Sequence, residues 1–101
     1  MSNKLLTVEF YVPSMDKNSI PISGLPIIRD ITKAFGGCTV YQGSGRYVMA
    51  DGATMIEAVS IVRTFVPEDR LEQVSTLAAY IKDTLNQETV LFTVNMVPTF
   101  I

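Results

Sequence analysis

The side chains best suited to chemistry in this sequence surround a pair of glycines, Gly43 and Gly45. Tyr41 precedes the pair, and Arg46 and Tyr47 follow it. An arginine binds phosphate or carboxylate through two parallel hydrogen bonds, and a tyrosine ring offers a face on which a base can stack. The segment therefore predicts a binding site for a small anionic ligand, built from a bent backbone, one guanidinium and two aromatic rings.

The glycine pair also has a purely structural interpretation. Gly43-Ser44-Gly45 lacks the third glycine and the following helix of a dinucleotide-binding fingerprint, which excludes a Rossmann-type site. The glycines can form a hairpin turn, or a β-bulge that bends one long strand before it turns back at Asp51-Gly52. We favour the bulged strand, because Asp-Gly is among the strongest hairpin signals and strand-like residues continue up to it.

The residue types that are missing exclude several classes of enzyme. The sequence has no histidine and one cysteine, Cys38. It therefore has no Ser-His or Cys-His nucleophile, no histidine-ligated metal, and no internal disulfide or thiolate cluster. Cys38 opens an apolar strand and is interpreted as a packing residue. We expect no catalytic residues, no metal site and no cofactor.

Length and charge limit the remaining functions. The chain has 101 residues, of which 48% are apolar, so residues 1–101 are expected to form a single domain. The 8 basic residues do not outnumber the 10 acidic ones and form no run, which argues against general nucleic-acid binding. Glu9 interrupts the apolar segment near the N-terminus, and no apolar run approaches the roughly 20 residues that span a bilayer. We expect a cytoplasmic protein with no membrane contact.

Hydrophobic periodicity predicts six elements, in the order strand, helix, strand, strand, helix, strand. Apolar residues alternate in 5–12 and 90–97, and 38–49 is strand-like on both sides of the glycine pair. Residues 55–66 are apolar on both faces, as expected of a strand inside the sheet. Apolar residues recur at helical spacing from Ser23 to Gly36 and from Pro67 to Asn86. This order is typical of the α+β ferredoxin-like βαββαβ fold, with a four-stranded antiparallel sheet and two helices on one face.

The face of this sheet opposite the helices is expected to be apolar. The alternation places on it Leu5, Tyr11, Met55, Val59, Ile61, Phe65, Leu91 and Val97. Such a surface predicts a homo-oligomer, a dimer or higher, that packs through this face. The polar residues among them are Thr7, Glu9, Glu57, Arg63, Thr93 and Asn95. They can form hydrogen bonds and ion pairs of the Glu57–Arg63 type inside the interface, or a ligand pocket between subunits.

One further candidate, Gln87, lies where the second helix meets the last strand, and its polar neighbours also suit a helix cap. The complete set of candidate ligand-binding residues is Tyr41, Arg46, Tyr47, Glu57, Arg63, Gln87 and Asn95. In this set an arginine would hold a phosphate, a tyrosine would stack on a base, and the other residues would bind polar edges.

A longer pattern resembles a known family. It reads F-G-G-x-T-V-Y-x-G-x-G-x-Y from Phe35 to Tyr47, continues through Gly52 and Glu57, and ends with N-Q-E-x-V-L before Phe100. It resembles small bacterial and phage domains of unknown function, which have tryptophan at the position of Tyr47. In size and style the chain is also similar to ferredoxin-like phage proteins that sequester nucleotide immune signals. That similarity implies a compact oligomer with pockets at its interfaces.

Three hypotheses follow. The first is a non-catalytic, oligomeric protein that binds a small anionic, nucleotide-derived ligand and serves as a phage anti-defence signal sponge. The second is a protein–protein interaction module that uses the open sheet face. The third is a cofactor-independent enzyme on a dimeric ferredoxin-like scaffold, with Glu57 or Tyr47 as acid or base.

Overall fold

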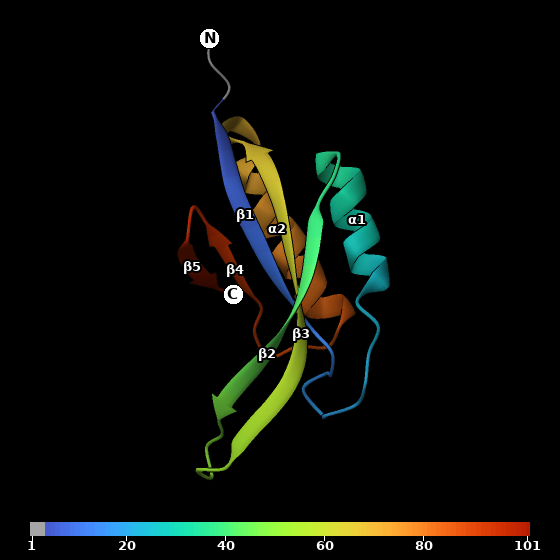
Figure 1. Cartoon of the computed structure of the whole chain (residues 1–101), viewed down its shortest axis with the longest axis vertical. Coiled ribbons are helices and arrows are strands. Elements are labelled where there is room, and N and C mark those ends of the chain that lie inside the picture. Colours follow the sequence, from blue (N-terminus) through green and yellow to red (C-terminus); the bar gives the residue numbers. More distant parts are fainter. Residues whose placement is uncertain (1–3) are drawn as a thin grey trace.

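The computed structural model describes residues 4–101 (Figure 1). Met1, Ser2 and Asn3, the start of the expected N-terminal segment, lie outside the described residues. The elements are β1 (Leu5–Pro13), α1 (Leu25–Phe35), β2 (Thr39–Val48), β3 (Thr54–Pro67), the 3-10 turn η1 (Glu68–Arg70), α2 (Leu71–Thr84), β4 (Leu91–Val94) and β5 (Val97–Phe100). No helix in residues 4–101 is long and apolar enough to cross a membrane.

The strands form one antiparallel sheet in the order β2-β3-β1-β4-β5. Both helices pack on one face, because Ile27 and Ile31 of α1 and Val74 and Ile81 of α2 share one buried cluster with Phe10 of β1. Burial of such side chains contributes about 1.5–3 kcal/mol each. The predicted α+β class, with two helices over an antiparallel sheet, is thus observed, but the sheet has five strands rather than four.

The fifth strand arises because residues 90–97 do not form one continuous strand. The chain reverses at Asn95 and Met96, whose φ angles are 48° and 71°. Two consecutive positive φ angles are typical of the tight turn that joins hairpin strands. Val97 therefore pairs with Val94, on the side of the helices, and its expected place on the open face was wrong. Beyond it, Pro98 of β5 pairs with Thr93.

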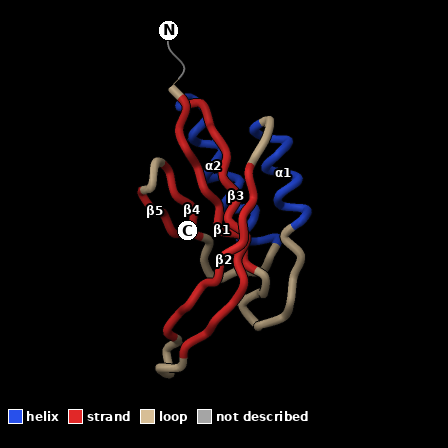
Figure 2. Tube along the Cα trace, in the orientation of Figure 1, coloured by secondary structure: helices blue, strands red, loops and turns tan. Residues whose placement is uncertain are grey.

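The long β2–β3 hairpin confirms the expected turn at Asp51-Gly52 but not the bulge. Gly52 has φ 87°, and the Ala53 amide donates to Asp51 Oδ1 at 2.9 Å. The pairing register runs without interruption along both strands. Gly45 instead makes room for a neighbour, since a Cβ there would overlap the Tyr47 hydroxyl. Figures 1 and 2 show that the end of the hairpin extends as an arm past the helices and the rest of the sheet.

The β4–β5 turn generates a stability prediction. Met96 is 78% exposed and adopts a left-handed conformation that costs a side-chain-bearing residue about 1–2 kcal/mol. We expect Met96→Gly to raise the free energy of unfolding by up to about 1 kcal/mol, because glycine pays no such penalty. Urea unfolding would measure the change. Ser44→Gly, within β2, is the control and should be destabilising; a loss of stability in Met96→Gly would contradict the prediction.

Candidate functional site

The open face of the sheet carries a hydrogen-bonded network of Glu9, Arg63 and Tyr41. Glu9 of β1 lies directly opposite Arg63 of β3, and Tyr41 comes from β2. Arg63 donates from Nε and Nη2 to Glu9 Oε2, at 3.1 and 2.9 Å, and the Tyr41 hydroxyl donates to the same oxygen. The Arg63 guanidinium also lies 5.6 Å from the centre of the Tyr41 ring. Three neighbouring strands thus position one carboxylate.

The electrostatics of this network favour its charged form. Glu9 is only 4% exposed, although it lies on the uncovered face. The Tyr41 hydrogen bond lowers the pKa of Glu9 below its ordinary 4.5, with help from Arg63, whereas burial acts in the opposite direction. The bond to Glu9 raises the pKa of Tyr41 and that of Arg63. At neutral pH the network therefore holds a carboxylate, a guanidinium and a neutral phenol.

The expected Glu57–Arg63 ion pair was wrong. Arg63 pairs with Glu9, which lies directly opposite it on the adjacent strand β1. Glu57 lies on β3 itself, six residues before Arg63. Six residues of strand span about 20 Å. Glu9 was not among the candidate ligand residues, although a lone acid in an alternating apolar strand was a signal for it.

A second cluster, in the hairpin arm, brings Tyr47 next to Glu57. Glu57 pairs across the strands with Gly45, over which the Tyr47 hydroxyl lies. Burial raises the pKa of Glu57, and burial followed by the charge of Glu57 raises the pKa of Tyr47. Among residues 4–101, Glu57 forms no ion pair. The arm therefore presents a phenol next to a carboxyl group that has no ion-pair partner among the described residues.

Arg46 does not belong to either cluster. In β2 it pairs with Ile56, and alternation places it on the sheet side opposite Tyr41 and Tyr47. The structure therefore separates the expected group of two rings and one guanidinium. Tyr41, Tyr47, Glu57 and Arg63 share the open side of the sheet, whereas Arg46 does not.

The side-chain amides of Gln87 and Asn95 form hydrogen bonds with backbone groups. Gln87 Nε2 donates to the carbonyls of Met15, at 2.8 Å, and Leu85, at 3.0 Å. Asn95 Oδ1 accepts the amide of Thr7 at 2.9 Å. The first contact ties the loop after β1 to the end of α2, and the second fixes the β4–β5 turn, so both amides have structural roles.

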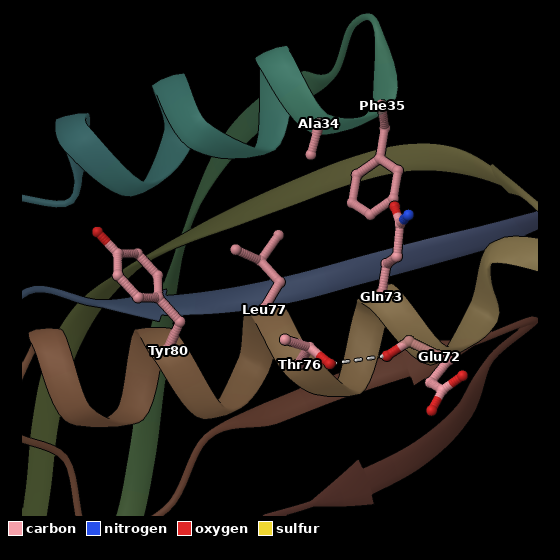
Figure 3. A pocket seen from close by; sticks show the side chains of 7 residues that line it. All are labelled: Ala34, Phe35, Glu72, Gln73, Thr76, Leu77 and Tyr80. Atoms are coloured by element: carbon pink, nitrogen blue, oxygen red, sulfur yellow. Dashed lines mark hydrogen bonds between the residues drawn. The ribbon is translucent and has the colours of Figure 1, made fainter.

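The surface has two pockets of note, and one of them includes a candidate residue. The larger, of about 460 Å³, lies between the helices, where Phe35 and Tyr80 stand on either side of Leu77 (Figure 3). Its walls are mainly apolar and it lies on the helix side, away from the polar clusters. The smaller, of about 310 Å³, runs from the end of α1 along the start of β2 and includes Thr39 and Arg63. This second pocket adjoins the Glu9 network.

The network generates a pH-dependent stability prediction. Because folding lowers the pKa of Glu9, its stabilising contribution is present above about pH 4.5 and is lost as pH falls through the folded pKa. Tyr41→Phe removes the main cause of the lowered pKa. We expect wild type to be more stable than Tyr41→Phe at about pH 7, and the difference in free energy of unfolding to shrink toward about pH 2.

Urea unfolding at a series of pH values measures this difference. Tyr11→Phe is the matched control, since Tyr11 lies on the same sheet face and has no side-chain hydrogen bond among residues 4–101. A difference between wild type and Tyr41→Phe that stays constant over the whole pH range would refute the assignment.

Comparison with known proteins identifies similar folds. No family model matches the chain, and no curated protein matches it, so the resemblance to small bacterial and phage domains stays a prediction. A phage SAM lyase in complex with S-methyl-5'-thioadenosine is 14% identical, with a TM-score of 0.77 over 100% of this chain and 92% of that one. A phage SAM lyase in the apo state is 17% identical, with a TM-score of 0.69 over 95% and 87%.

A Bacillus cereus protein related to NIF3 has a TM-score of 0.64 at 15% identity, and 98% of this chain matches 26% of that protein. At these identities the likenesses show a shared fold. They also overturn one expectation from the sequence: a protein without catalytic activity is contradicted, because the two lyases that match nearly the whole chain are enzymes.

Proposed function

We propose that this protein binds an adenosyl compound on its open sheet face and acts as a lyase on S-adenosylmethionine. The observation that carries the proposal is the likeness of the whole chain to a phage SAM lyase that holds S-methyl-5'-thioadenosine. It retains the nucleotide-derived ligand expected from the sequence and replaces the signal sponge with an enzyme. We place the reaction in the cytoplasm, with phage anti-defence as its context.

The proposed reaction needs no side-chain nucleophile. The bond between the sulfonium sulfur and the γ-carbon of the methionine part breaks, and its electron pair stays on sulfur to give S-methyl-5'-thioadenosine. An oxygen of the substrate's own carboxylate bonds to that carbon, which closes a five-membered lactone. No water, cofactor or proton transfer is required, so the absence of histidine is no obstacle.

The open face supplies a suitable environment for this step. The positive sulfonium and the negative carboxylate neutralise each other in the transition state, so exclusion of water favours the reaction. The face is rich in aromatic and aliphatic side chains, including Leu5 and Phe65, both 58% exposed, and Phe100, 66% exposed. We propose that a second copy of the chain covers this face and closes the site.

A covered site can combine both polar clusters. Arg63 and Glu57 are too far apart along β3 to contact one small ligand in the same chain. A second copy could bring the arm of one chain to the Glu9 network of another. In this arrangement Tyr47 stacks on adenine, Glu57 accepts hydrogen bonds from the ribose hydroxyls, and the Tyr41 ring faces the sulfonium.

The first test is chemical. Purified protein incubated with S-adenosylmethionine should release S-methyl-5'-thioadenosine, measured by liquid chromatography, faster than the spontaneous decay in buffer. Glu57→Gln should lower kcat/KM by roughly 10- to 100-fold, because a hydrogen bond to a charged group contributes about 1.5–3 kcal/mol. Glu88→Gln is the matched control, since Glu88 is exposed between α2 and β4. Release no faster than in buffer would overturn the proposed lyase activity.

The second test concerns assembly. Phe65→Asp places a charge on the open face at an exposed position, so it should convert the oligomer to monomer and abolish lyase activity while the circular dichroism spectrum stays unchanged. Sedimentation velocity would measure the mass. Leu25→Asp makes the same type of change at an exposed site at the start of α1 and should leave the oligomer intact. A monomeric wild-type protein would rule out the closed interface.

A further inference from the structure

We infer that the Glu9–Arg63 pair binds the α-amino-acid end of the substrate, with the ammonium group at Glu9 and the carboxylate at Arg63. The inference rests on the proposed function and adds a residue-level basis for distinguishing S-adenosylmethionine from its thioether product. It is carried by the hydrogen-bonding capacity that the pair leaves unused.

Glu9 has one oxygen to spare. All three hydrogen bonds to its carboxylate end on Oε2, so within residues 4–101 Oε1 accepts none. Within residues 4–101, Thr93 Oγ1 is the side-chain polar atom that is both fully buried and without a hydrogen bond. Since Oε1 of Glu9 also has no hydrogen bond, it keeps some exposure to solvent. A carboxylate oxygen that is negatively charged, unpaired and not fully buried is an acceptor for an ammonium group.

Arg63 has a complementary donor to spare. It uses Nε and Nη2 for Glu9, and Nη2 also approaches the Tyr41 hydroxyl at 3.3 Å, which leaves Nη1 without a protein partner among the described residues. The side chain is 46% exposed and lines the pocket of about 310 Å³. Thr39, its cross-strand neighbour on β2, lines the same pocket and offers a hydroxyl. A carboxylate can therefore reach Nη1 from this pocket.

A third group at this position also lacks a partner. Thr93 of β4 lies directly opposite Glu9, on the side away from Arg63, and its hydroxyl oxygen is buried without a hydrogen bond. An unsatisfied buried hydroxyl costs about 1–3 kcal/mol. Thr93 thus adds a third unused polar group to the row formed by Arg63 and Glu9 across the strands.

The charges select a zwitterion over a simple anion. A lone carboxylate at Arg63 would also be repelled by Glu9, about 3 Å from that guanidinium. An α-amino acid carries both charges next to each other and can match both partners. One carboxylate oxygen then lies at Arg63, and the other is left to close the lactone. S-Methyl-5'-thioadenosine has no amino-acid end and would lose both contacts, which favours its release.

Calorimetric titration with stable thioethers tests the inference without turnover. S-Adenosyl-L-homocysteine keeps the amino-acid end, its decarboxylated analogue lacks only the carboxylate, and S-methyl-5'-thioadenosine lacks the whole end. We expect wild type to bind S-adenosyl-L-homocysteine at least tenfold more tightly than either of the other two. Arg63→Gln should remove this advantage and leave the affinity for S-methyl-5'-thioadenosine within about twofold.

The controls separate this inference from the proposed function. Arg46→Gln, on the other side of the sheet, should change none of the affinities. If Arg63→Gln fails to fold, Arg63→Lys takes its place, and the decarboxylated analogue tests the carboxylate contact on wild type. Failure of wild type to bind all three compounds overturns the proposed function together with this inference. Equal affinities for all three in wild type, or an equal loss for all three in the Arg63 variant, overturn this inference alone.

Discussion

The buried carboxylate of Glu9 imposes the strictest constraint on the sheet. A charge that is almost entirely removed from water must be paired and hydrogen-bonded, and here the partners come from two other strands, β2 and β3. This holds only if the three strands keep their register. A slip of one residue would turn Glu9 toward the side occupied by Val8 and Phe10, both fully buried beneath the helices. The ion pair thus requires the same register that the core requires.

The sequence predicted the elements that depend on local patterns. Alternation located the strands, the left-handed Gly36 ended α1 as expected, and Asp51-Gly52 marked the hairpin turn. The features that were missed depend on partners far away in the sequence. The ion partner of Arg63 is set by the residue that lies opposite it on β1, and the reversal at Asn95-Met96 lacks the glycine that usually marks such turns. Polar type alone also could not distinguish Gln87, bound to backbone, from a ligand-binding amide.

The expectation of a non-catalytic protein, which the likeness to the phage SAM lyases contradicts, rested on an argument that covers only some kinds of reaction. The absence of histidine and of a second cysteine argues against Ser-His and Cys-His nucleophiles and against metal sites built from histidine or several thiolates. It does not reach reactions in which the substrate supplies its own nucleophile and leaving group. For those, a site needs a shaped, dry and charge-matched surface, and such a surface leaves no short motif in a sequence. The apolar open face with its few fixed charges is therefore more informative than any triplet of residues.

The two edges of the sheet differ in a way that limits how it can be extended. The β5 edge is four residues long and contains Pro98, which has no amide hydrogen to offer an incoming strand. The β2 edge is ten residues long and contains no proline. A further strand can therefore pair with the β2 edge, whereas Pro98 hinders pairing at the β5 edge. Copies that met edge to edge would stop at a closed pair joined through β2, and this asymmetry protects the protein against growth into a continuous fibre.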